Sequence, residues 1–477
     1  MTAPLMAVAL LAVLSIIDWS EVTGGRMSNF SLIEDLLDVD EVANELHTTA
    51  EILDPALDAV LSEVTSEAEL PVQELSVDEL PVDELPTGVE MSPTGNQSAG
   101  DVVSSVRPSP MERIDGVWPI EDYSPDGDGL RHLRNALSKR DSRRVRIAFI
   151  GDSYIEGDIL TQDIRRLLQD EFGGHGVGYM SMHSEFPGFR RSVHQADQGW
   201  EARDMRNRSK DRIRPLSGEY CVGSSGAVLT LKGSKVDNAD RWSSTKLLFL
   251  SDSDGEISIK TDAADSIFDV KASDKIQMIE LQDETTKMTL TSRIQGVRVL
   301  GAWIEDNSGV GVDCMSLRGN SGVSHCDLSV EIAAEMNELL PYDLIVIEYG
   351  LNALSAGQTD YSYYGRLMTK VVERIRQCYP ECDILMLGVG DRGRKSGATV
   401  RSMSTTGAMV SAQRKCAREC GVMFWDMREA MGGEDAVVSW REKGLVNADY
   451  IHLNHKGGGE LAKEFVNSLK MKLNESH

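Results

Sequence analysis

Short apolar runs alternate with amphipathic stretches along much of the chain. Four runs rich in Val, Ile, Leu and Phe are typical of strands buried on both faces: 145–150, 344–347, 384–388 and 422–425. Each is followed by a stretch with apolar residues at helical spacing, which predicts a helix: 159–172, 364–378, 407–420 and 458–473. Strands that alternate with helices predict a parallel sheet covered on both faces. The active site of such a sheet lies at the carboxyl ends of the strands.

The hydrophobic period changes between residues 187 and 310. Short runs in this region alternate apolar and polar residues, as half-buried strands do: 227–231, 246–250, 256–260, 287–291 and 297–300. Turn residues separate the runs, including the common hairpin turn Asp254-Gly255. This spacing of antiparallel strands predicts a β-sandwich of the jelly-roll type. We therefore expect a β module inserted into the α/β domain after its first strand and helix.

An apolar segment near the N-terminus, residues 4–17, predicts export. It is shorter than the roughly 20 residues that a membrane-spanning helix needs, so it suits the core of a signal peptide. No Lys or Arg precedes it, and no clear small-x-small cleavage site follows it. The sequence therefore predicts that residues 1–26 are a cleaved signal peptide or a retained membrane anchor, and that the folded part lies in the periplasm or cell envelope.

Residues 27–110 have the composition of an acidic, disordered linker. Residues 27–100 hold 18 Asp or Glu and no Lys or Arg, and Val-Asp-Glu-Leu-Pro repeats at 77–81 and 82–86. Such a segment cannot bury enough apolar surface to offset the entropy of ordering it. The whole chain has 49 Lys and Arg against 76 Asp and Glu, a formal charge of −27. This excess of negative charge argues against a nucleic-acid partner.

Candidate catalytic residues follow two of the predicted strands. The sequence Gly-Asp-Ser at 151–153 comes directly after one strand, and Gly-Leu-Asn at 350–352 closely follows another. A third group, Asp449 and His452, precedes the last predicted helix. Taken singly each signal is weak, because Ser and Asp commonly cap helices and an Asp-x-x-His pair arises by chance. Both strand-end groups nevertheless lie where a parallel sheet places its active site.

Together and in this order, these groups resemble the four sequence blocks of the SGNH (GDSL-like) hydrolases, which supply Ser, Gly, Asn and His. Ser153 lies in the first block, and the segment 312–322, which contains Gly319, is similar to the second. Asn352 and His452 match the third and fourth blocks, although the residue after Asn352 is Ala where the family usually has Asp. The resemblance implies an α/β hydrolase domain of flavodoxin-like, three-layer α/β/α architecture with a parallel sheet.

The resemblance also implies a domain organisation. The hydrolase domain is expected in two parts, residues 111–186 and 311–477, which are interrupted by the β-sandwich insert at 187–310.

Asp152 adjoins the predicted nucleophile, but adjacent side chains point apart, so we expect it to hydrogen-bond the backbone of its own loop.

The roles that the resemblance assigns suit the chemistry of these side chains. A serine hydroxyl is a weak nucleophile until a base removes its proton, and His452 is the candidate base for Ser153. Asp449 is expected to hold the other ring nitrogen and so fix the tautomer. The backbone N–H groups of Ser153 and Gly319 and the side-chain amide of Asn352 are expected to form the oxyanion hole. This chemistry implies no cofactor and no metal.

A metal site remains open as an alternative at the same residues. Asp449, His452 and His455 are spaced three apart and could chelate a metal ion from one helical face. The seven cysteines do not match a zinc-site pattern. Their odd number and low density favour small core residues over a disulfide scaffold.

The position of the insert, between the first and second sequence blocks, narrows the resemblance to one group within the family. Bacterial peptidoglycan O-acetylesterases carry a carbohydrate-binding-like β module between the same two blocks, and residues 388–392 and 424–426 resemble exported proteins of that group. The resemblance implies an exported serine esterase that removes O-acetyl groups from a polysaccharide, with peptidoglycan as its first candidate. The same site would suit a polysaccharide O-acetyltransferase, a hemicellulose acetyl esterase, or a lipase or thioesterase. A non-catalytic glycan-binding protein is the alternative outside enzymes, and three insert residues either stack on sugars or pack in the core: Trp200, Trp242 and Trp303.

Overall fold

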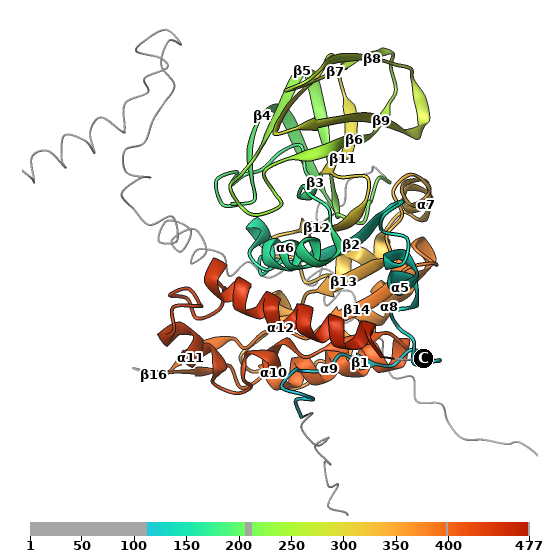
Figure 1. Ribbon diagram of the computed structural model, residues 1–477. Helices are drawn as coiled ribbons and strands as arrows, with labels where there is room; N and C mark the ends of the chain where they lie inside the picture. Colours follow the sequence, from blue (N-terminus) through green and yellow to red (C-terminus); the bar gives the residue numbers. More distant parts are fainter. Residues whose placement is uncertain (1–111, 206–211, 397–398, 476–477) are drawn as a thin grey trace, which may run out of the picture.

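The computed structural model describes residues 112–205, 212–396 and 399–475. The predicted signal peptide or anchor at 1–26 and the predicted linker at 27–110 lie outside the described residues. No helix within the described part of the chain is long and apolar enough to cross a membrane. An α/β domain and a β-rich insert lie one above the other (Figure 1).

A six-stranded sheet forms the centre of the α/β domain, in the order β1-β17-β14-β13-β2-β12. Its strands are β1 (Glu121–Asp122), β2 (Arg144–Gly151), β12 (Gly309–Ser316), β13 (Leu344–Glu348), β14 (Asp383–Leu387) and β17 (Met423–Trp425). Neighbouring strands are parallel except β1, which is antiparallel to β17. The parallel strands therefore follow the flavodoxin-like order, in which the second strand of the chain lies outside the first. This order places the topological switch point between β2 and β13.

Helices cover both faces of this sheet (Figure 1). One face carries α6 (Thr161–Phe172) and α12 (His455–Leu473), which pack against each other, and the other carries α7 (Val330–Leu339), α8 (Ser362–Cys378) and α9 (Thr406–Cys420). Shorter elements complete the domain: α5 (Arg131–Leu137), α10 (Met427–Met431), α11 (Ala436–Glu442) and the hairpin of β15 (Gly393–Ser396) and β16 (Thr399–Ser402). Phe465 anchors α12 through edge contacts with Phe149 of β2 and Trp425 of β17.

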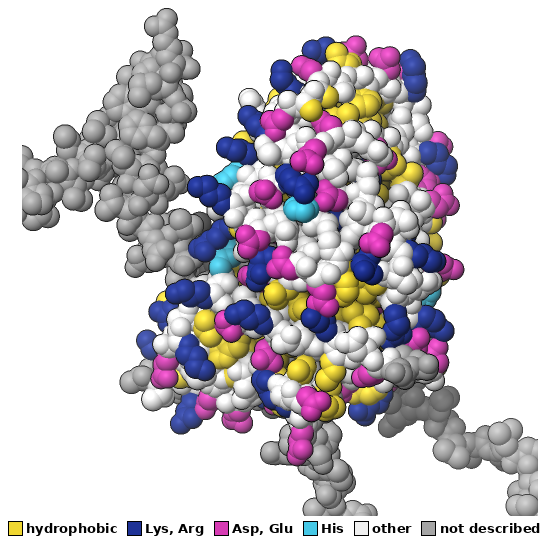
Figure 2. All heavy atoms as spheres, viewed as in Figure 1, with side chains coloured by type: hydrophobic (Ala, Val, Ile, Leu, Met, Phe, Trp, Pro, Cys, Tyr) yellow, Lys and Arg dark blue, Asp and Glu magenta, His cyan; other side chains and the backbone are white. Residues whose placement is uncertain are grey.

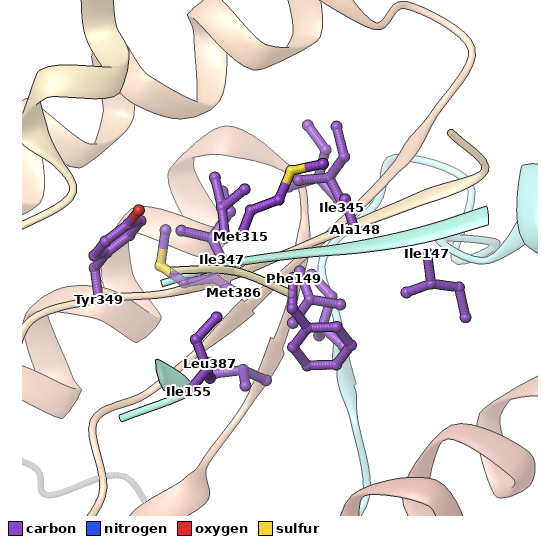
Figure 3. Packing of buried hydrophobic residues seen from close by; sticks show 14 of the residues in the cluster. Ile147, Ala148, Phe149, Ile155, Met315, Ile345, Ile347, Tyr349, Met386 and Leu387 are labelled. Atoms are coloured by element: carbon purple, nitrogen blue, oxygen red, sulfur yellow. The ribbon is translucent and has the colours of Figure 1, made fainter. Parts of the chain in front are cut away.

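The core of the α/β domain lies on both faces of the central strands. Every residue of β2, β13 and β14 is buried, and their side chains pack above and below the sheet, as Figure 3 shows for Phe149, Ile347 and Leu387. This burial on both faces is why the strands read as continuous apolar runs. The four predicted strands and the four helices predicted after them are all present.

The insert is an antiparallel sheet with a core of its own. Its strands are β3 (Gly178–Met180), β4 (Val193–Asp204), β5 (Glu219–Gly233), β6 (Trp242–Ser251), β7 (Gly255–Thr261), β8 (Asp265–Val270), β9 (Ser273–Thr285), β10 (Lys287–Ser292) and β11 (Val297–Glu305). Hydrogen bonds join them into one nine-stranded sheet. The predicted antiparallel character is confirmed, and the jelly-roll arrangement stays a prediction.

The tryptophans of the insert pack in the core. Trp242 and Trp303 are fully buried, and Trp200 is 7% exposed. The structure therefore favours the core interpretation of these three rings over the alternative that they stack on sugars.

Buried charges join the insert to the α/β domain. Glu305, at the end of β11, is fully buried. Its carboxylate pairs with Arg146 of β2 and lies 3.5 Å from Arg144 of the same strand. Lys246 of β6 lies 3.2 Å from it. Burial raises the pKa of Glu305, but the positive charges of Arg146, Lys246 and Arg144 outweigh burial and lower it to about 2.

Candidate active site

Ser153 lies just beyond the carboxyl end of β2, at the switch point of the sheet. β2 ends at Gly151, and the chain turns through Ser153 into the short helix η1 (Glu156–Asp158) and then into α6. Ser153 is nearly buried, because only 8% of the residue is exposed. Its Oγ lies 2.9 Å from Nε2 of His452, a distance at which an imidazole can take the hydroxyl proton.

Asp449 and His452 lie in a short loop before α12 that backbone hydrogen bonds hold closed. Val446 and Leu453 form an isolated antiparallel bridge, and the N–H of Asn447 donates to the His452 carbonyl at 2.8 Å. Inside this loop, Asp449 Oδ2 lies 2.7 Å from His452 Nδ1. The three-residue spacing therefore brings both side chains together within one turn of the chain.

The surroundings of Asp449 keep its carboxylate ionised. Burial raises the pKa of Asp449, but the hydrogen bond and charge of His452 and two backbone N–H groups outweigh burial and lower it. Those N–H groups belong to Ile451 and His452, at 2.9 and 3.1 Å from Oδ1. An ionised Asp449 accepts the Nδ1 proton, which leaves Nε2 free to accept the proton of Ser153.

Hydrogen bonds between loops bring the three predicted oxyanion donors together. The N–H of Leu317 donates to the carbonyl of the last residue of β2 at 2.8 Å, so the loop with Gly319 runs beside that of Ser153. Asn352 lies in η3 (Leu351–Ala353), directly after β13, and its Nδ2 is 3.1 Å from the Asn320 carbonyl. Among the contacts of the described residues, the backbone N–H groups of Ser153 and Gly319 donate to no protein acceptor.

Gly319 adopts a backbone conformation that favours glycine. Its φ is +73°, in the left-handed region where a side chain is strained. This turn lets the chain end β12 at Ser316 and pass close to the start of the Ser153 loop. The predicted glycine of the second block therefore has a conformational reason to be glycine.

Two acidic residues next to the predicted nucleophile make contacts that the sequence did not indicate. As expected, Asp152 accepts a backbone N–H of its own loop, from Tyr154 at 2.9 Å. It also accepts the Asn352 Nδ2 at 2.8 Å. Glu348, the last residue of β13, is fully buried against Asp152. The one signal in the sequence was a charged residue at the end of an otherwise apolar strand.

A cavity of about 200 Å³ lies between η1 and the insert. Glu156 and Arg318 line it and form an ion pair at 2.9 Å, and the guanidinium of Arg318 lies 4.7 Å from the centre of the Phe186 ring. Burial raises the pKa of Glu156, while the charges of Arg318 and His452 act against burial. Part of the wall comes from the insert, because β4 and β5 contribute lining residues, among them Asp204 and Glu219.

The metal alternative finds no support in the geometry. Both ring nitrogens of His452 are engaged, by Ser153 and by Asp449. The ring of His455, which begins α12, is tilted against Phe189 with 6.4 Å between centroids. Within the described ranges, no group of three or more His, Cys, Asp or Glu side chains is arranged to hold a metal ion.

Comparisons with known proteins agree with this geometry. Residues 296–458 match the model of the GDSL-like Lipase/Acylhydrolase family. A solved structure of a peptidoglycan O-acetylesterase is similar, with 20% identity, a TM-score of 0.63, and coverage of 75% of this chain and 99% of that chain. A family two carbohydrate esterase from Cellvibrio japonicus is 12% identical, with a TM-score of 0.26 and coverage of 59% of this chain and 98% of that chain.

A search of curated proteins finds no match to this chain. The likeness to the peptidoglycan O-acetylesterase shows a shared fold, and the family match covers the segments that hold Gly319, Asn352, Asp449 and His452. Residues 296–458 therefore match the GDSL-like Lipase/Acylhydrolase family, and this match supports a hydrolase of carboxylic esters.

Proposed function

We propose that this protein is an exported serine esterase that removes O-acetyl groups from a polysaccharide, with peptidoglycan as its substrate. The single observation that carries the chemistry is the hydrogen-bonded series from Ser153 through His452 to Asp449, at 2.9 and 2.7 Å. Such a series activates a serine for attack on an acyl carbon. No step of this mechanism uses a metal or another cofactor.

The first half of the reaction transfers the acetyl group to the serine. His452 Nε2 removes the proton from Ser153 Oγ as this oxygen attacks the acetyl carbon, and the carbonyl oxygen becomes an oxyanion. The N–H groups of Ser153 and Gly319 and the Asn352 amide stabilise that charge, and one such donor typically contributes about 10²–10³ in rate. The bond to the sugar oxygen then breaks, and His452 gives its proton to that oxygen.

The second half releases acetate. A water molecule attacks the acetyl-serine while His452 takes one of its protons, and collapse of the second oxyanion returns the proton to Ser153. Asp449 holds the imidazole in one tautomer throughout and stabilises its charged form. A sugar hydroxyl in place of this water would make the same site an O-acetyltransferase.

The cavity between η1 and the insert supports a sugar substrate. Glu156 offers a hydrogen-bond acceptor, Arg318 offers donors, and Phe186 offers an apolar face, which together suit the hydroxyl groups and apolar ring face of a sugar. Because the insert supplies part of the wall, a glycan bound there contacts both domains. On the face shown in Figure 2, basic and acidic side chains are interspersed, so this surface lacks the continuous basic patch that a nucleic acid needs.

Turnover of p-nitrophenyl acetate tests the esterase chemistry. We expect Ser153→Ala and His452→Ala to abolish turnover, and Ser411→Ala, an exposed serine on α9, to leave it unchanged. EDTA is expected to leave the wild-type rate unchanged. Turnover that survives in Ser153→Ala would exclude the serine mechanism, and loss with EDTA would restore the metal alternative.

Acetate release from polymers tests the substrate. We expect release from O-acetylated peptidoglycan and much slower release from acetylated xylan. The reverse preference would assign a hemicellulose esterase. Transfer of acetyl to a glycan without acetate release would assign a transferase, and binding without either reaction would assign a glycan-binding protein.

Export is proposed from the apolar segment at residues 4–17. A fusion of residues 1–30 to an enzyme active only outside the cytoplasm is expected to be active, and a fusion that starts at residue 31 is expected to be inactive. Equal activity of both fusions would contradict export through this segment.

A further inference from the structure

Two buried carboxyl groups lie against each other beneath the nucleophile. Asp152 precedes Ser153 and Glu348 ends β13, and both acidic residues are 0% exposed. Glu348 is opposite Gly151 in the register of β13 and β2. A Cβ added to Gly151 would lie 2.7 Å from Glu348 Oε2. The glycine at the end of β2 therefore leaves room for the Glu348 carboxyl group.

The closeness of the two carboxyl groups favours one proton between them. Both side chains are fully buried, the Asp152 N–H lies 3.4 Å from Glu348 Oε2, and two ionised carboxylates have only acceptors to offer. Two carboxylates in contact and out of water also repel, so one of them binds a proton. Among the described residues, neither Asp152 nor Glu348 forms an ion pair with Lys or Arg that would stabilise a second negative charge.

The contacts of each residue show which one carries the charge. Asp152 accepts good hydrogen bonds at both oxygens, from Tyr154 N–H at 2.9 Å and from Asn352 Nδ2 at 2.8 Å. Glu348 Oε2 accepts only a long contact from the Asp152 N–H at 3.4 Å. Its Oε1 is buried and, among the described residues, has no hydrogen-bond partner. An ionised group in that setting is costly, so Glu348 is the protonated member.

The electrostatics agree with this assignment. Burial and then the charge of Asp152 raise the pKa of Glu348 well above its ordinary range. Burial also raises the pKa of Asp152, but its hydrogen bonds and the charge of His452 limit the rise to about 6. Asp152 is therefore the stronger acid of the two, and its carboxylate faces Asn352.

We propose that Glu348 is a positioning residue for ester cleavage: as a neutral acid it donates a hydrogen bond to Asp152 and holds that carboxylate against the Asn352 amide. One N–H of Asn352 then points at Asp152, which fixes the plane of the amide. Its other N–H donates to the Asn320 carbonyl at 3.1 Å, and an acyl oxygen bound at the oxyanion hole would replace this carbonyl as its acceptor. The inference rests on ester cleavage at Ser153 and is independent of the identity of the polysaccharide.

Two substitutions of Glu348 separate this role from simple packing. Glu348→Gln keeps a hydrogen-bond donor in the same place, whereas Glu348→Met fills a similar volume without one. With p-nitrophenyl acetate we expect kcat of Glu348→Gln to stay within about threefold of wild type. We expect kcat of Glu348→Met to fall by at least about tenfold with KM unchanged, because oxyanion stabilisation acts on the transition state. A kcat of Glu348→Met equal to wild type, or a kcat of Glu348→Gln as low as that of Glu348→Met, would overturn the proposal.

A double-mutant cycle tests whether Glu348 acts through Asp152. We expect Asp152→Asn to lower kcat by itself and Glu348→Met to add little in the Asp152→Asn background. Fully additive losses would overturn the proposed path. Thermal unfolding of each variant identifies any that fail to fold.

Gly151→Ala tests the same proposal without replacing Asp152 or Glu348. Its added Cβ would lie 2.7 Å from Glu348 Oε2 and 2.8 Å from the Glu348 backbone oxygen, so the end of β13 shifts together with the carboxyl group and we expect at least the same fall in kcat. A folded Gly151→Ala variant with wild-type kcat would contradict the proposal even if Glu348→Met does not fold. Ser153→Ala is assayed in parallel to keep the two proposals apart. Turnover that survives in Ser153→Ala would reject the serine mechanism. If Ser153→Ala is inactive and the Glu348 variants behave otherwise than expected, only the role of Glu348 is rejected.

Discussion

Ser153 Oγ lies 2.9 Å from His452 Nε2, although 299 residues separate them in the chain. The contact depends on two helices that flank these residues, since α6 follows Ser153, α12 follows His452, and the two pack side by side (Figure 1). The chain just before α6 comes close to α12 at Gly458, where an added Cβ would lie 2.0 Å from the Ile159 carbonyl oxygen. Glycine at this position therefore allows the imidazole to reach the serine.

Gly458→Ala is expected to separate the base from the nucleophile. A backbone oxygen cannot move as a side chain does, so the start of α12 must shift away from Ile159. We expect kcat for p-nitrophenyl acetate to fall by about 10², the cost of a displacement near 1 Å.

The neighbouring glycine supplies the control for that change. A Cβ at Gly459 meets only the Asp163 carboxylate, at 3.2 Å, and this side chain can move aside. Gly459→Ala is therefore expected to keep kcat and to raise Tm slightly, because Ala favours the helix. Equal kcat values for the two variants would show that the packing of α12 on Ile159 does not position His452.

Asp449→Asn tests the orientation of the imidazole. The amide cannot stabilise a charged imidazole and favours the wrong tautomer, so we expect kcat to fall by about 10⁴ with KM nearly unchanged. Asp274→Asn, an exposed aspartate in the insert, is the matched control. A loss below about tenfold in Asp449→Asn would mean that His452 is held by its loop rather than by this carboxylate.

The central sheet could be predicted because its strands are buried on both faces. Such strands appear in the sequence as unbroken apolar runs, and β13 is an example, with five consecutive buried residues. β12 was not predicted, although all but its last residue are buried. Its sequence includes Asp313, whose carboxylate is accepted in the core because Trp303, Tyr342 and the Tyr179 N–H donate hydrogen bonds to it from other elements. Partners so distant in the chain leave no local pattern.

The residues of the candidate site also divide into those that a local sequence pattern identifies and those that depend on partners distant in the chain. Ser153, Asp449 and His452 could be identified because residue type, order and spacing all match a family pattern, and the structure brings them into contact. Glu348 and Glu156 could not be, because their surroundings come from other strands and from the loop of Arg318. The protonation state of a carboxyl group cannot be predicted from the sequence, because it depends on neighbours that only the fold brings together.

Phe186→Ala tests whether the cavity beside η1 binds the glycan. Loss of the ring removes the surface under Arg318 and an apolar face for a sugar. We expect KM for O-acetylated peptidoglycan to rise by about tenfold relative to that for p-nitrophenyl acetate, which carries no sugar for the cavity to bind. Ile267→Ala, at an exposed apolar residue of β8, is the control. An unchanged ratio of the two KM values would place the glycan elsewhere.

Glu305→Gln is expected to weaken the junction between the insert and the α/β domain. Removing the carboxylate leaves the buried Arg144 and Arg146 without an ion-pair partner and Lys246 with only Glu280 at 3.5 Å, which costs about 3–5 kcal/mol of unfolding free energy at pH 7. Glu284→Gln, whose side chain is 71% exposed, is expected to cost little.

The contribution of Glu305 to the free energy of unfolding is expected to depend on pH. Glu305 has a folded-state pKa of about 2, below its ordinary value of 4.5. Its stabilising contribution is therefore complete above pH 4.5 and is lost as the pH falls toward 2, because the unfolded chain binds the proton first. The difference in unfolding free energy between wild type and Glu305→Gln should accordingly shrink as the pH falls through this window. A difference that stays constant from pH 7 to pH 2 would show that the Glu305 carboxylate does not hold the two domains together through its charge.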